Sequence, residues 1–421
     1  MREMKDSGVE WIGEIPVTWN VYRNKNAFMC SKDLVGGKSS ETQLLSLTTK
    51  GIKQKDINNA EGKLPESFDT YQYVKTDEMV MCLFDLDCSA VFSGLSPYDG
   101  MISPAYRVLT CTCRMVPKYA DYWFQYISHG RKFNHYAKNI RYSLSYEEFS
   151  ALPMLFPNIE DQMRISSYLD AKCSKIEEII EKQQAIIEKL KEYKLSIITE
   201  AVTKGLNPDV EMKDSGIEWI GTIPKDWNLM KLKYATEMMR GKFNHRPRND
   251  PDFYDGIYPF VQTGDVARAN KYIKTYSQTL NEKGYGVSKK FPRGCICMTI
   301  AANVGDVAIL NFDACFPDSV VGFNPTENTY GNYLYYTLCA MKKQFMRRAI
   351  ISTQMNLNIE IIKEEFIPVA GYDEQIEISK YLDEKCVWID ITIEKRKSVI
   401  DKLQEYKKSL IYEVVTGKKE V

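Results

Sequence analysis

The sequence predicts an α+β protein with two mixed α/β globular domains separated by a long antiparallel two-helix coiled coil, related by a pseudo-twofold internal repeat. Three observations support this prediction. Residues 4–20 recur at 212–228, with 13 of 17 positions identical. A heptad pattern ends each half of the chain in a matching register. The stretches between, 21–142 and 229–355, share little that can be aligned. We therefore expect a duplicated frame, made of the two headings and the two heptad stretches, that holds two diverged domains.

The repeated heading reads MKDSGVEWIGEIPVTWN in the first half and MKDSGIEWIGTIPKDWN in the second, at an offset of 208 residues. The later repeat, which begins at Gln162 and Gln375, has an offset of 213. The second middle region is therefore longer by five residues. Similar ends and dissimilar middles indicate duplication followed by divergence. We therefore expect the two copies of the frame to have the same function and the two middle regions to have different functions.

Each half ends in a stretch that is predicted to form one helix of about 40 residues, because neither contains Pro or Gly before Gly205 or Gly417. Seam residues alternate at spacings of three and four, as in a coiled coil. The first predicted seam is Ile165, Leu169, Lys172, Ile176, Ile179, Gln183, Ile186, Leu190, Tyr193 and Ile197. The second is Ile378, Leu382, Lys385, Ile389, Thr392, Arg396, Val399, Leu403, Tyr406 and Leu410. The polar members Lys172, Gln183, Lys385 and Arg396 are expected to fix the register.

Chain connectivity favours antiparallel pairing of these helices within one chain, and pairing of each helix in another subunit is the alternative. The predicted domains are a first globular domain at 1–157, a first long helix at 158–205, a second globular domain at 206–370 and a second long helix at 371–421.

Composition indicates a folded chain without a strong charge. Lys+Arg and Asp+Glu both number 56, so net charge neither suggests nor excludes nucleic acid, whose binding depends on local basic faces. No apolar leader or run of 18 apolar residues is present, and we expect a cytoplasmic protein. The 11 cysteines form no disulfide pattern. Cys111, Cys113, Cys295 and Cys297 are expected to pack in the core, and with only three histidines we expect no metal site.

A basic and aromatic passage lies near the end of each middle region, at 129–143 and 342–356. Such mixtures can neutralise phosphates and contact base edges, although a solvated helix face followed by a polar loop is the alternative interpretation. The candidate DNA-binding residues are Arg131, Lys132, Lys138, Arg141, Tyr142, Ser143, Lys343, Arg347, Arg348, Thr353, Gln354 and Asn356.

The sequence lacks the motifs of an enzyme. It has no phosphate-binding Gly-x-x-x-x-Gly-Lys-Ser/Thr, no dinucleotide-binding Gly-x-Gly-x-x-Gly, no Gly-x-Ser-x-Gly and no amino-methyltransferase Asp/Asn-Pro-Pro-aromatic stretch. Pro317-Asp318 lacks the Glu-x-Lys that a metal nuclease needs on the next strand. We therefore predict a protein that binds and does not catalyse.

The doubled heading resembles one family, the specificity subunits of Type I restriction-modification systems. The residues that carry this resemblance are Asp6 to Pro16 with Trp19, their copies Asp214 to Pro224 with Trp227, and the later Asp161-Gln162…Tyr168-Leu169-Asp170 and Glu374-Gln375…Tyr381-Leu382-Asp383. The resemblance covers the whole chain. It implies that the middles are target recognition domains, each contacting one half of a split DNA sequence, and that the helical pair sets the spacing.

The resemblance also implies partners. Two modification subunits, which carry S-adenosylmethionine and methylate adenine, would dock on the frame, and two motor-nuclease subunits can join them; no cofactor is expected on this chain. Residues kept in both copies are candidates for partner contact or for the frame: Trp11, Trp19, Trp219, Trp227, Gln162, Tyr168, Gln375 and Tyr381. For the tryptophans, packing against their own domain is the alternative. Two other functions stay open: a tandem protein-binding scaffold without DNA specificity, and a methyltransferase with unrecognised motifs.

Overall fold

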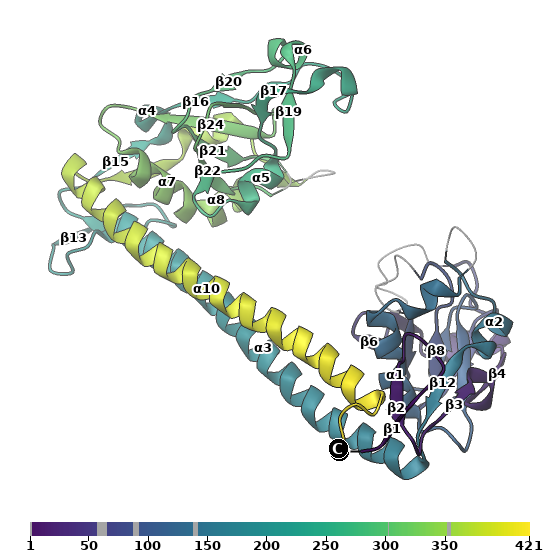
Figure 1. Cartoon of the computed structure of the whole chain (residues 1–421). Coiled ribbons are helices and arrows are strands. Elements are labelled where there is room, and N and C mark those ends of the chain that lie inside the picture. The colour runs from purple at the N-terminus through teal and green to yellow at the C-terminus, as the bar shows by residue number, and fades with distance from the viewer. Residues whose placement is uncertain (1, 57–64, 87–91, 138–141, 302, 352–354) are drawn as a thin grey trace. The chain divides into compact units, whose positions relative to one another are not determined.

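The computed structural model describes residues 2–56, 65–86, 92–137, 142–301, 303–351 and 355–421, in two compact units (Figure 1). The first unit contains Met1–Gln183 and Ser398–Val421, and the second contains Gln184–Lys397. Mixed helices and sheets in both units confirm the predicted α+β class. None of the helices in the described ranges is long and apolar enough to cross a membrane.

Each heading folds into a hairpin with the same internal geometry. Strands β1 (Met4–Asp6) and β2 (Glu14–Pro16) pair in the first unit, and β13 (Met212–Asp214) and β14 (Thr222–Pro224) pair in the second. The Asp6 carboxylate accepts a hydrogen bond from Gly8 N at 3.0 Å, and Asp214 accepts one from Gly216 N at 3.0 Å. Both glycines have φ near +70°, which favours glycine. The Asp-Ser-Gly repeat is therefore explained by turn geometry.

The main sheet of the first unit is antiparallel, with the strand order β4-β11-β8-β9. Its strands are β4 (Phe28–Ser31), β11 (Arg107–Cys111), β8 (Met79–Met81) and β9 (Ser93–Leu95). The smaller pairs are β3 (Asn20–Arg23) with β12 (Pro153–Phe156), β5 (Leu45–Thr48) with β6 (Gly51–Gln54), and β7 (Gln72–Val74) with β10 (Gly100–Ile102). The helices of this globular body are α1 (Pro117–His129) and α2 (Tyr146–Ala151), with 3-10 turns η1 (Asn24–Asn26), η2 (Gly36–Glu41) and η3 (Lys132–His135).

The main sheet of the second unit has the order β16-β24-β21-β22-β18. Its strands are β16 (Thr236–Arg240), β24 (Val320–Pro325), β21 (Ile296–Thr299), β22 (Val307–Leu310) and β18 (Tyr272–Ile273). The other strands are β15 (Asn228–Lys231), β27 (Phe366–Val369), β17 (Tyr254–Phe260), β19 (Gln278–Leu280), β20 (Lys290–Phe291), β23 (Ala314–Cys315), β25 (Ile350–Ile351) and β26 (Met355–Asn356). The helices are α4 (Leu232–Ala235), α5 (Thr263–Arg268), α6 (Glu282–Gly286), α7 (Gly331–Ala340), α8 (Lys342–Arg348) and α9 (Ile359–Glu364), with the 3-10 turn η4 (Pro251–Phe253).

Four strands of each main sheet share one topology, although the sequences of the middle regions do not align; β18 of the second sheet, which pairs parallel with β22, is additional. Met79 of β8 and Ile296 of β21 occupy the same place, because each lies in a strand with antiparallel neighbours on both sides in the same chain order. The middles therefore diverged in sequence and kept their fold. This is physically reasonable, since a buried strand position requires only an apolar side chain of suitable volume.

Two long helices complete the structure, as the sequence predicted. α3 (Ile159–Lys204) has 46 residues and begins in the first unit, whereas α10 (Tyr372–Val415) has 44 and begins in the second. In the first unit Lys407 of α10 forms an ion pair with Glu177 of α3. In the second unit Lys194 Nζ of α3 lies 2.7 Å from Asp390 Oδ1 of α10. Both lysines and both carboxylates are related by the 213-residue repeat, so each unit joins its two helix segments in the same way.

The predicted seams were wrong at some of their positions, although Ile165 and Ile378 of the same sets are buried. Lys172, Ile179 and Tyr193 are exposed, whereas Cys173 and Ile187 are buried. The same shift by one residue occurs in α10, where Lys385, Val399 and Tyr406 are exposed while Cys386, Ile393 and Ile400 are buried. The error arose because apolar residues also lie one position after several predicted seam residues. The sequence therefore allows two registers for the seam, and burial in the structure selects one of them. The polar positions Gln183 and Arg396 are half-buried as expected of a seam, but Lys172 and Lys385 are not seam residues.

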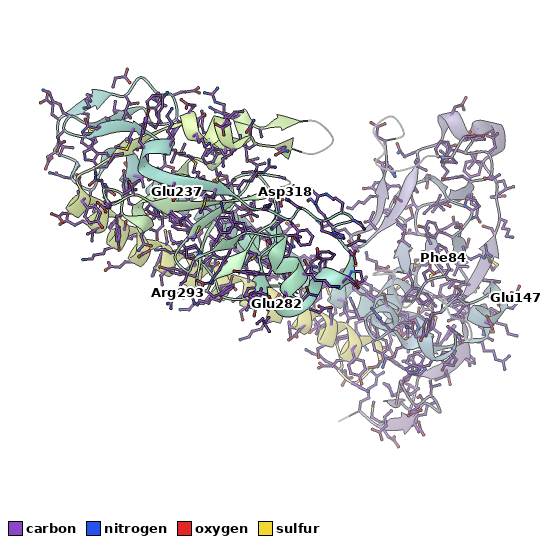
Figure 2. All side chains as sticks on the ribbon, turned by 90° about the horizontal axis from the view of Figure 1, so that it is seen from above. Phe84, Glu147, Glu237, Glu282, Arg293 and Asp318 are labelled. Atoms are coloured by element: carbon purple, nitrogen blue, oxygen red, sulfur yellow. The ribbon has the colours of Figure 1, made fainter. Side chains whose placement is uncertain are left out.

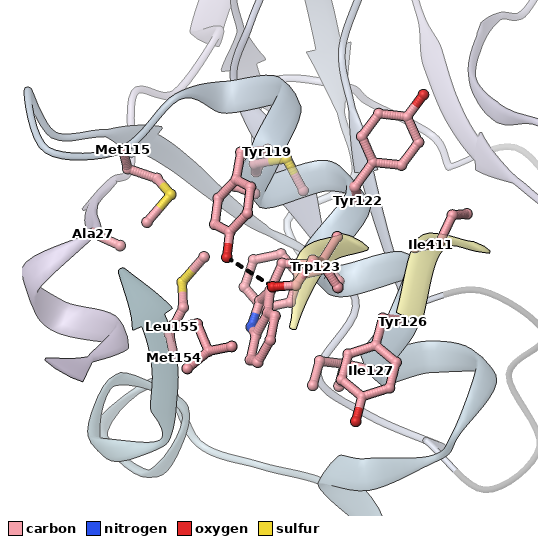
Figure 3. Packing of buried hydrophobic residues seen from close by; sticks show 14 of the residues in the cluster. Ala27, Met115, Tyr119, Tyr122, Trp123, Tyr126, Ile127, Met154, Leu155 and Ile411 are labelled. Carbon is pink, nitrogen blue, oxygen red and sulfur yellow. Dashed lines mark hydrogen bonds between the residues drawn. The ribbon is translucent and has the colours of Figure 1, made fainter. Parts of the chain in front are cut away.

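The core of the first unit joins α1 to the end of α10. Figure 3 shows Tyr119, Trp123 and Tyr126 of α1 beside Ile411 of α10, and all four are buried. Tyr119 Oη donates a hydrogen bond to Val415 O at 3.3 Å. In the second unit Tyr333 Oη of α7 donates to Val202 O of α3 at 3.1 Å. In each unit, therefore, the last turns of a long helix complete the core of the globular body.

Candidate nucleic-acid interface

The frame begins with a buried tryptophan anchored to a long helix. Trp19 Nε1 donates to Asp161 Oδ2 of α3 at 3.1 Å, and Trp227 Nε1 donates to Glu374 Oε2 of α10 at 2.9 Å. Both indoles are 1% exposed, so packing within their own unit is their observed role. Burial raises the pKa of the Glu374 carboxyl, although the Trp227 hydrogen bond opposes that change.

Gln162 and Gln375 are buried and make matched hydrogen bonds. Gln162 Oε1 accepts from Val116 N at 2.8 Å, and its Nε2 donates to two backbone carbonyls, Arg114 O and Pro157 O. Gln375 accepts from Tyr330 N at 2.8 Å and also donates to two carbonyls. Each glutamine thereby fixes the start of a long helix to the start of the helix in its globular body. A buried, fully used amide of this kind serves the frame.

The repeated aspartates make a third matched contact. Tyr122 Oη donates to Asp170 Oδ1 at 2.7 Å, and Tyr336 Oη donates to Asp383 Oδ1 at 2.5 Å. Burial, and then the aspartate hydrogen bond, raises the pKa of both tyrosines well above the ordinary value. Both phenols therefore stay protonated donors at neutral pH.

The remaining candidates of the frame are more accessible. Trp11 is half-buried and donates to Tyr136 Oη at 2.8 Å, whereas the buried Nε1 atom of Trp219 has no hydrogen-bond partner among the described residues. Tyr168 is half-buried, and Tyr381 is 37% exposed. Among the frame candidates these two tyrosines best suit contact with another protein.

Four segments meet at one end of each main sheet, which we call the sheet end. They are the end of the edge strand (β4 or β16), the start of β11 or β24, the loop after β8 or β21, and the segment before α2 or α9. In the first unit Leu144 N donates to Leu83 O at 2.8 Å. In the second, Leu357 N donates to Ile300 O at 2.8 Å. Both predicted DNA-binding passages therefore end beside a loop that the sequence did not single out.

The sheet end of the first unit is aromatic. Tyr142 is 39% exposed and has a left-handed φ of 44°, a strained conformation for an aromatic residue. Phe84, which is labelled in Figure 2, belongs to the loop after β8 and is 37% exposed. Its ring stacks on that of Tyr106, with the ring centroids 6.2 Å apart. Exposed aromatic groups and strained backbone are typical of functional loops. Tyr142 therefore stays a DNA-binding candidate, and Phe84 and Tyr106 join it.

The sheet end of the second unit is polar. Asn356 is exposed and bridges to Ala301 in the loop after β21. Lys342 Nζ lies 2.6 Å from Asp306 Oδ1, at the start of β22. At the end of β16, Arg240 Nε donates to Asp318 O at 2.6 Å. In the sequence, Asp318 stands out only as part of an incomplete nuclease motif. No local pattern indicates that β16 pairs with β24.

The other predicted DNA-binding residues are distributed as follows. Lys138, Arg141, Thr353 and Gln354 lie outside the described residues. Arg131 is exposed, Lys132 is half-buried in η3, and Ser143 is half-buried beside Tyr142. Lys343 is exposed on α8, where Arg347 and Arg348 form ion pairs at 3.1 Å with Glu218 and Glu365. Both arginines stay more than half exposed, so DNA contact by them stays a prediction.

The paired cysteines pack mostly as predicted. Cys295 and Cys297 are buried, and burial raises the pKa of the Cys295 thiol to about 12. Cys111 is half-buried, but Cys113 is exposed because it follows the end of β11, so its predicted core position was wrong. The ranges that the structure describes contain no group of three or more His, Cys, Asp or Glu residues that could hold a metal ion.

Comparisons with known proteins agree with the resemblance. Residues 224–402 match the family model described as type I restriction modification DNA specificity domain. The provisionally named MjaX type I restriction enzyme specificity subunit of Methanocaldococcus jannaschii is 23% identical over 443 residues, covering 97% of this chain and 95% of that protein. The MjaIX specificity subunit of the same organism is 27% identical over 194 residues, covering 45% of this chain and 43% of its own length.

A solved structure shares the fold. Its description is "Structural basis underlying complex assembly and conformational transition of the type I R-M system", and the TM-score is 0.70 at 13% identity, covering 96% of this chain and 99% of that one. The second half of the chain thus carries a specificity domain of the type I restriction-modification class. Over 97% of its length the chain is similar to a type I restriction enzyme specificity subunit, in agreement with the resemblance of its doubled heading.

Proposed function

We propose that the chain recognises a split DNA target: each globular body contacts one half, and the pair of long helices acts as a coiled coil that fixes the spacing. One observation supports this most strongly. The anchors at Trp19 and Trp227, and at Gln162 and Gln375, are the same in both units, whereas the two sheet ends differ in chemistry. Equal frames with unequal contact surfaces suit a protein that presents two different half-sites to one symmetric partner assembly.

The dimensions of the helices fit this role. At 1.5 Å per residue, helices of 46 and 44 residues are roughly 65 to 70 Å long. Half-sites on one face of B-DNA are about 34 Å apart, or one helical turn. A helical pair of this length is therefore sufficient to impose such a separation on two attached domains.

The frame is also the proposed docking surface for two modification subunits. Tyr193 and Tyr406 are exposed by 54% and 53% at matched positions of the two helices. An aromatic residue that is kept in both copies, and exposed in both, suits contact with two copies of one partner. S-adenosylmethionine would be held by those partners, so this chain itself would be non-catalytic and act on DNA in the cytoplasm; motor-nuclease subunits would join for cleavage.

The test is methylome sequencing of a host that expresses this chain with its modification subunit, compared with a host that lacks this chain. We expect a split motif with methyl-adenine in both halves that disappears without the chain. A soluble complex that methylates no new motif would contradict DNA specificity and leave the protein-binding scaffold.

A second experiment tests the spacing. Inserting seven residues after Gln183 and seven after Arg396 keeps the heptad register and should lengthen the helical pair by about 10 Å. We expect the spacer of the methylated motif to grow by about three base pairs. Insertion into one helix alone is the control and should abolish methylation, because it breaks the pairing register. An unchanged motif with both insertions would exclude the spacing role.

A further inference from the structure

Three arginines gather around Asp318 at the sheet end of the second unit, two at its carboxylate and one at its backbone oxygen. Arg248 Nη2 lies 2.7 Å from both oxygens of Asp318, and Arg246 Nη2 lies 3.6 Å from Oδ2. Arg240 Nε donates to the backbone oxygen of Asp318 at 2.6 Å. No sequence motif suggested this cluster, because the arginines come from β16 and the loop after it, about 70 residues before Asp318.

The loop that carries the arginines is held in place. A side chain at Gly241 would meet Pro317 O at 2.1 Å, so the chain passes directly against the segment before Asp318. Tyr254 Oη donates to Arg248 O, which fixes the backbone at the arginine itself. His245 stacks on Phe253 with ring centroids 3.8 Å apart. The guanidinium group of Arg248 is therefore presented from a supported position.

The three arginines differ in which donors remain, and Arg240 keeps the N–H groups of both Nη atoms among the described contacts. Arg246 uses Nη1 for two backbone carbonyls, Phe243 O and His245 O, and Arg240 uses Nε. Arg248 uses only Nη2, so among the described contacts its Nε–H and both Nη1–H groups remain available. Its side chain is 51% exposed. The two forks of a guanidinium group are Nε–H with Nη2–H and Nη1–H with Nη2–H, and both include the Nη2 that Asp318 occupies. The free Nε–H and Nη1–H groups therefore offer single hydrogen bonds to separate acceptors.

Other carboxylates near the loop have their own partners. Asp250 pairs with His245 at 2.8 Å, and Asp252 lies 3.9 Å from Lys283. Among the described ion pairs, Asp318 is shared by Arg246 and Arg248, so this group keeps an excess of positive charge. An excess of this kind favours an anionic or electron-rich ligand.

The cluster is continuous with the candidate interface. Ile300 N donates to Ser319 O at 2.9 Å, and Ile300 O accepts from Leu357 N. Asp318 therefore lies beside the loop after β21, which itself contacts the predicted DNA-binding segment at Asn356. Arg293 precedes β21 at the opposite end of this strand, and Figure 2 shows it well away from Asp318.

We propose that Arg248, held by Asp318, contacts the DNA half-site of the second unit through single hydrogen bonds from its free Nε–H and Nη1–H groups. This inference rests on the proposed function. The acceptors are base-edge atoms such as guanine O6 or N7, or phosphate oxygens, since a guanidinium N–H donates to both kinds of atom. Asp318 is a positioning residue, because it orients the guanidinium group without facing DNA itself.

The test uses the complex with its modification subunits, and compares Arg248→Ala, Arg248→Lys and Asp318→Asn with Arg293→Ala, a matched exposed arginine. If the acceptors are a guanine edge, Arg248→Ala should relax one base position in one half of the methylated motif, with a loss of discrimination of about tenfold to a hundredfold. The other half should not change. If they are phosphate oxygens, DNA binding should weaken for all sequences. The slope of log affinity against log salt concentration should then decrease in magnitude by about 1.

Asp318→Asn should reproduce the Arg248→Ala effect in weaker form at the same position, which a purely structural role would not do. Arg248→Lys should not restore the wild-type preference, because an ammonium group lacks the planar set of donors that can hold Asp318 and reach a DNA acceptor together. The inference would be overturned if Arg248→Ala and Arg293→Ala gave the same methylated motif, the same extent of methylation and the same DNA affinity. Wild-type protein without any motif would instead contradict the proposed function, so the two failures are distinguishable.

Discussion

The two units share their interior contacts and differ in the residues that they expose at the sheet ends. Both anchor a heading tryptophan to a carboxylate on a long helix, and both use a buried glutamine at the helix start. Their sheet ends contrast: Phe84, Tyr106 and Tyr142 in the first unit, and Arg248 with Asp318 in the second. The difference indicates that selection kept the interior contacts in both copies and allowed the contact surface to change.

The largest difference is expected at the glycines that end the long helices. Gly417 and Gly205 have φ of +73° and +75°, but a side chain at Gly417 would meet Pro16 Cδ at 2.5 Å, whereas at Gly205 the nearest atom is Glu374 Oε1 at 3.2 Å. Gly205→Ala should cost about 1 to 2 kcal/mol of unfolding free energy through backbone strain. Gly417→Ala should cost roughly 3 to 4 kcal/mol, because overpacking is added.

Thermal melting with hydrogen exchange would measure both glycine effects and assign each to its unit. Gly371→Ala is the control, since nothing lies within 4 Å of a side chain there. Equal losses for Gly417→Ala and Gly205→Ala would show that contact with Pro16 and Trp19 is easily relaxed.

A smaller contrast is expected at the lysines beside the repeated aspartates. Lys271 pairs with Asp383, is 16% exposed and lies 5.0 to 5.5 Å from three tyrosine rings. Lys118 lies 3.7 Å from Asp170, and both groups are nearly half exposed. Lys271→Met should destabilise the second unit by about 1 to 2 kcal/mol, and Lys118→Met the first by less than about 0.5 kcal/mol. Denaturant unfolding would measure both, and a larger loss for Lys118→Met would refute the comparison.

The smallest effect concerns an ion pair that only the second unit has among the described residues. Hydrogen bonds from Lys231 and Lys233 lower the pKa of Glu364 to about 2, whereas the matching position of the first unit is Ala151. A lowered carboxyl pKa stabilises the fold above the unfolded value of about 4.3, and this contribution is lost as pH falls toward 2. The difference in melting temperature between wild type and Glu364→Gln should therefore shrink between pH 6 and pH 3. A constant difference across that range would show that the charge of Glu364 is irrelevant.

Prediction succeeded where periodicity or repetition was available. The two long helices, the duplicated halves and the family followed from the heptads and from the heading. The register of the seams failed at Lys172 and Lys385, because a seam is decided by which residues face the partner helix. In the candidate interface, Tyr142 and Asn356 are predicted from their matched positions in the two basic and aromatic passages. Both lie at the sheet ends, and their contact with DNA stays a prediction.

The sequence by itself determined the frame, because an internal repeat records which residues were kept twice. Only the tertiary structure decided the common topology of the two middles, since a buried strand tolerates many apolar sequences. It alone brought Arg248 to Asp318, because sheet pairing joins β16 to β24 across about 80 residues of chain. Long-range contacts of this kind leave no local periodicity, and so no signal in one sequence.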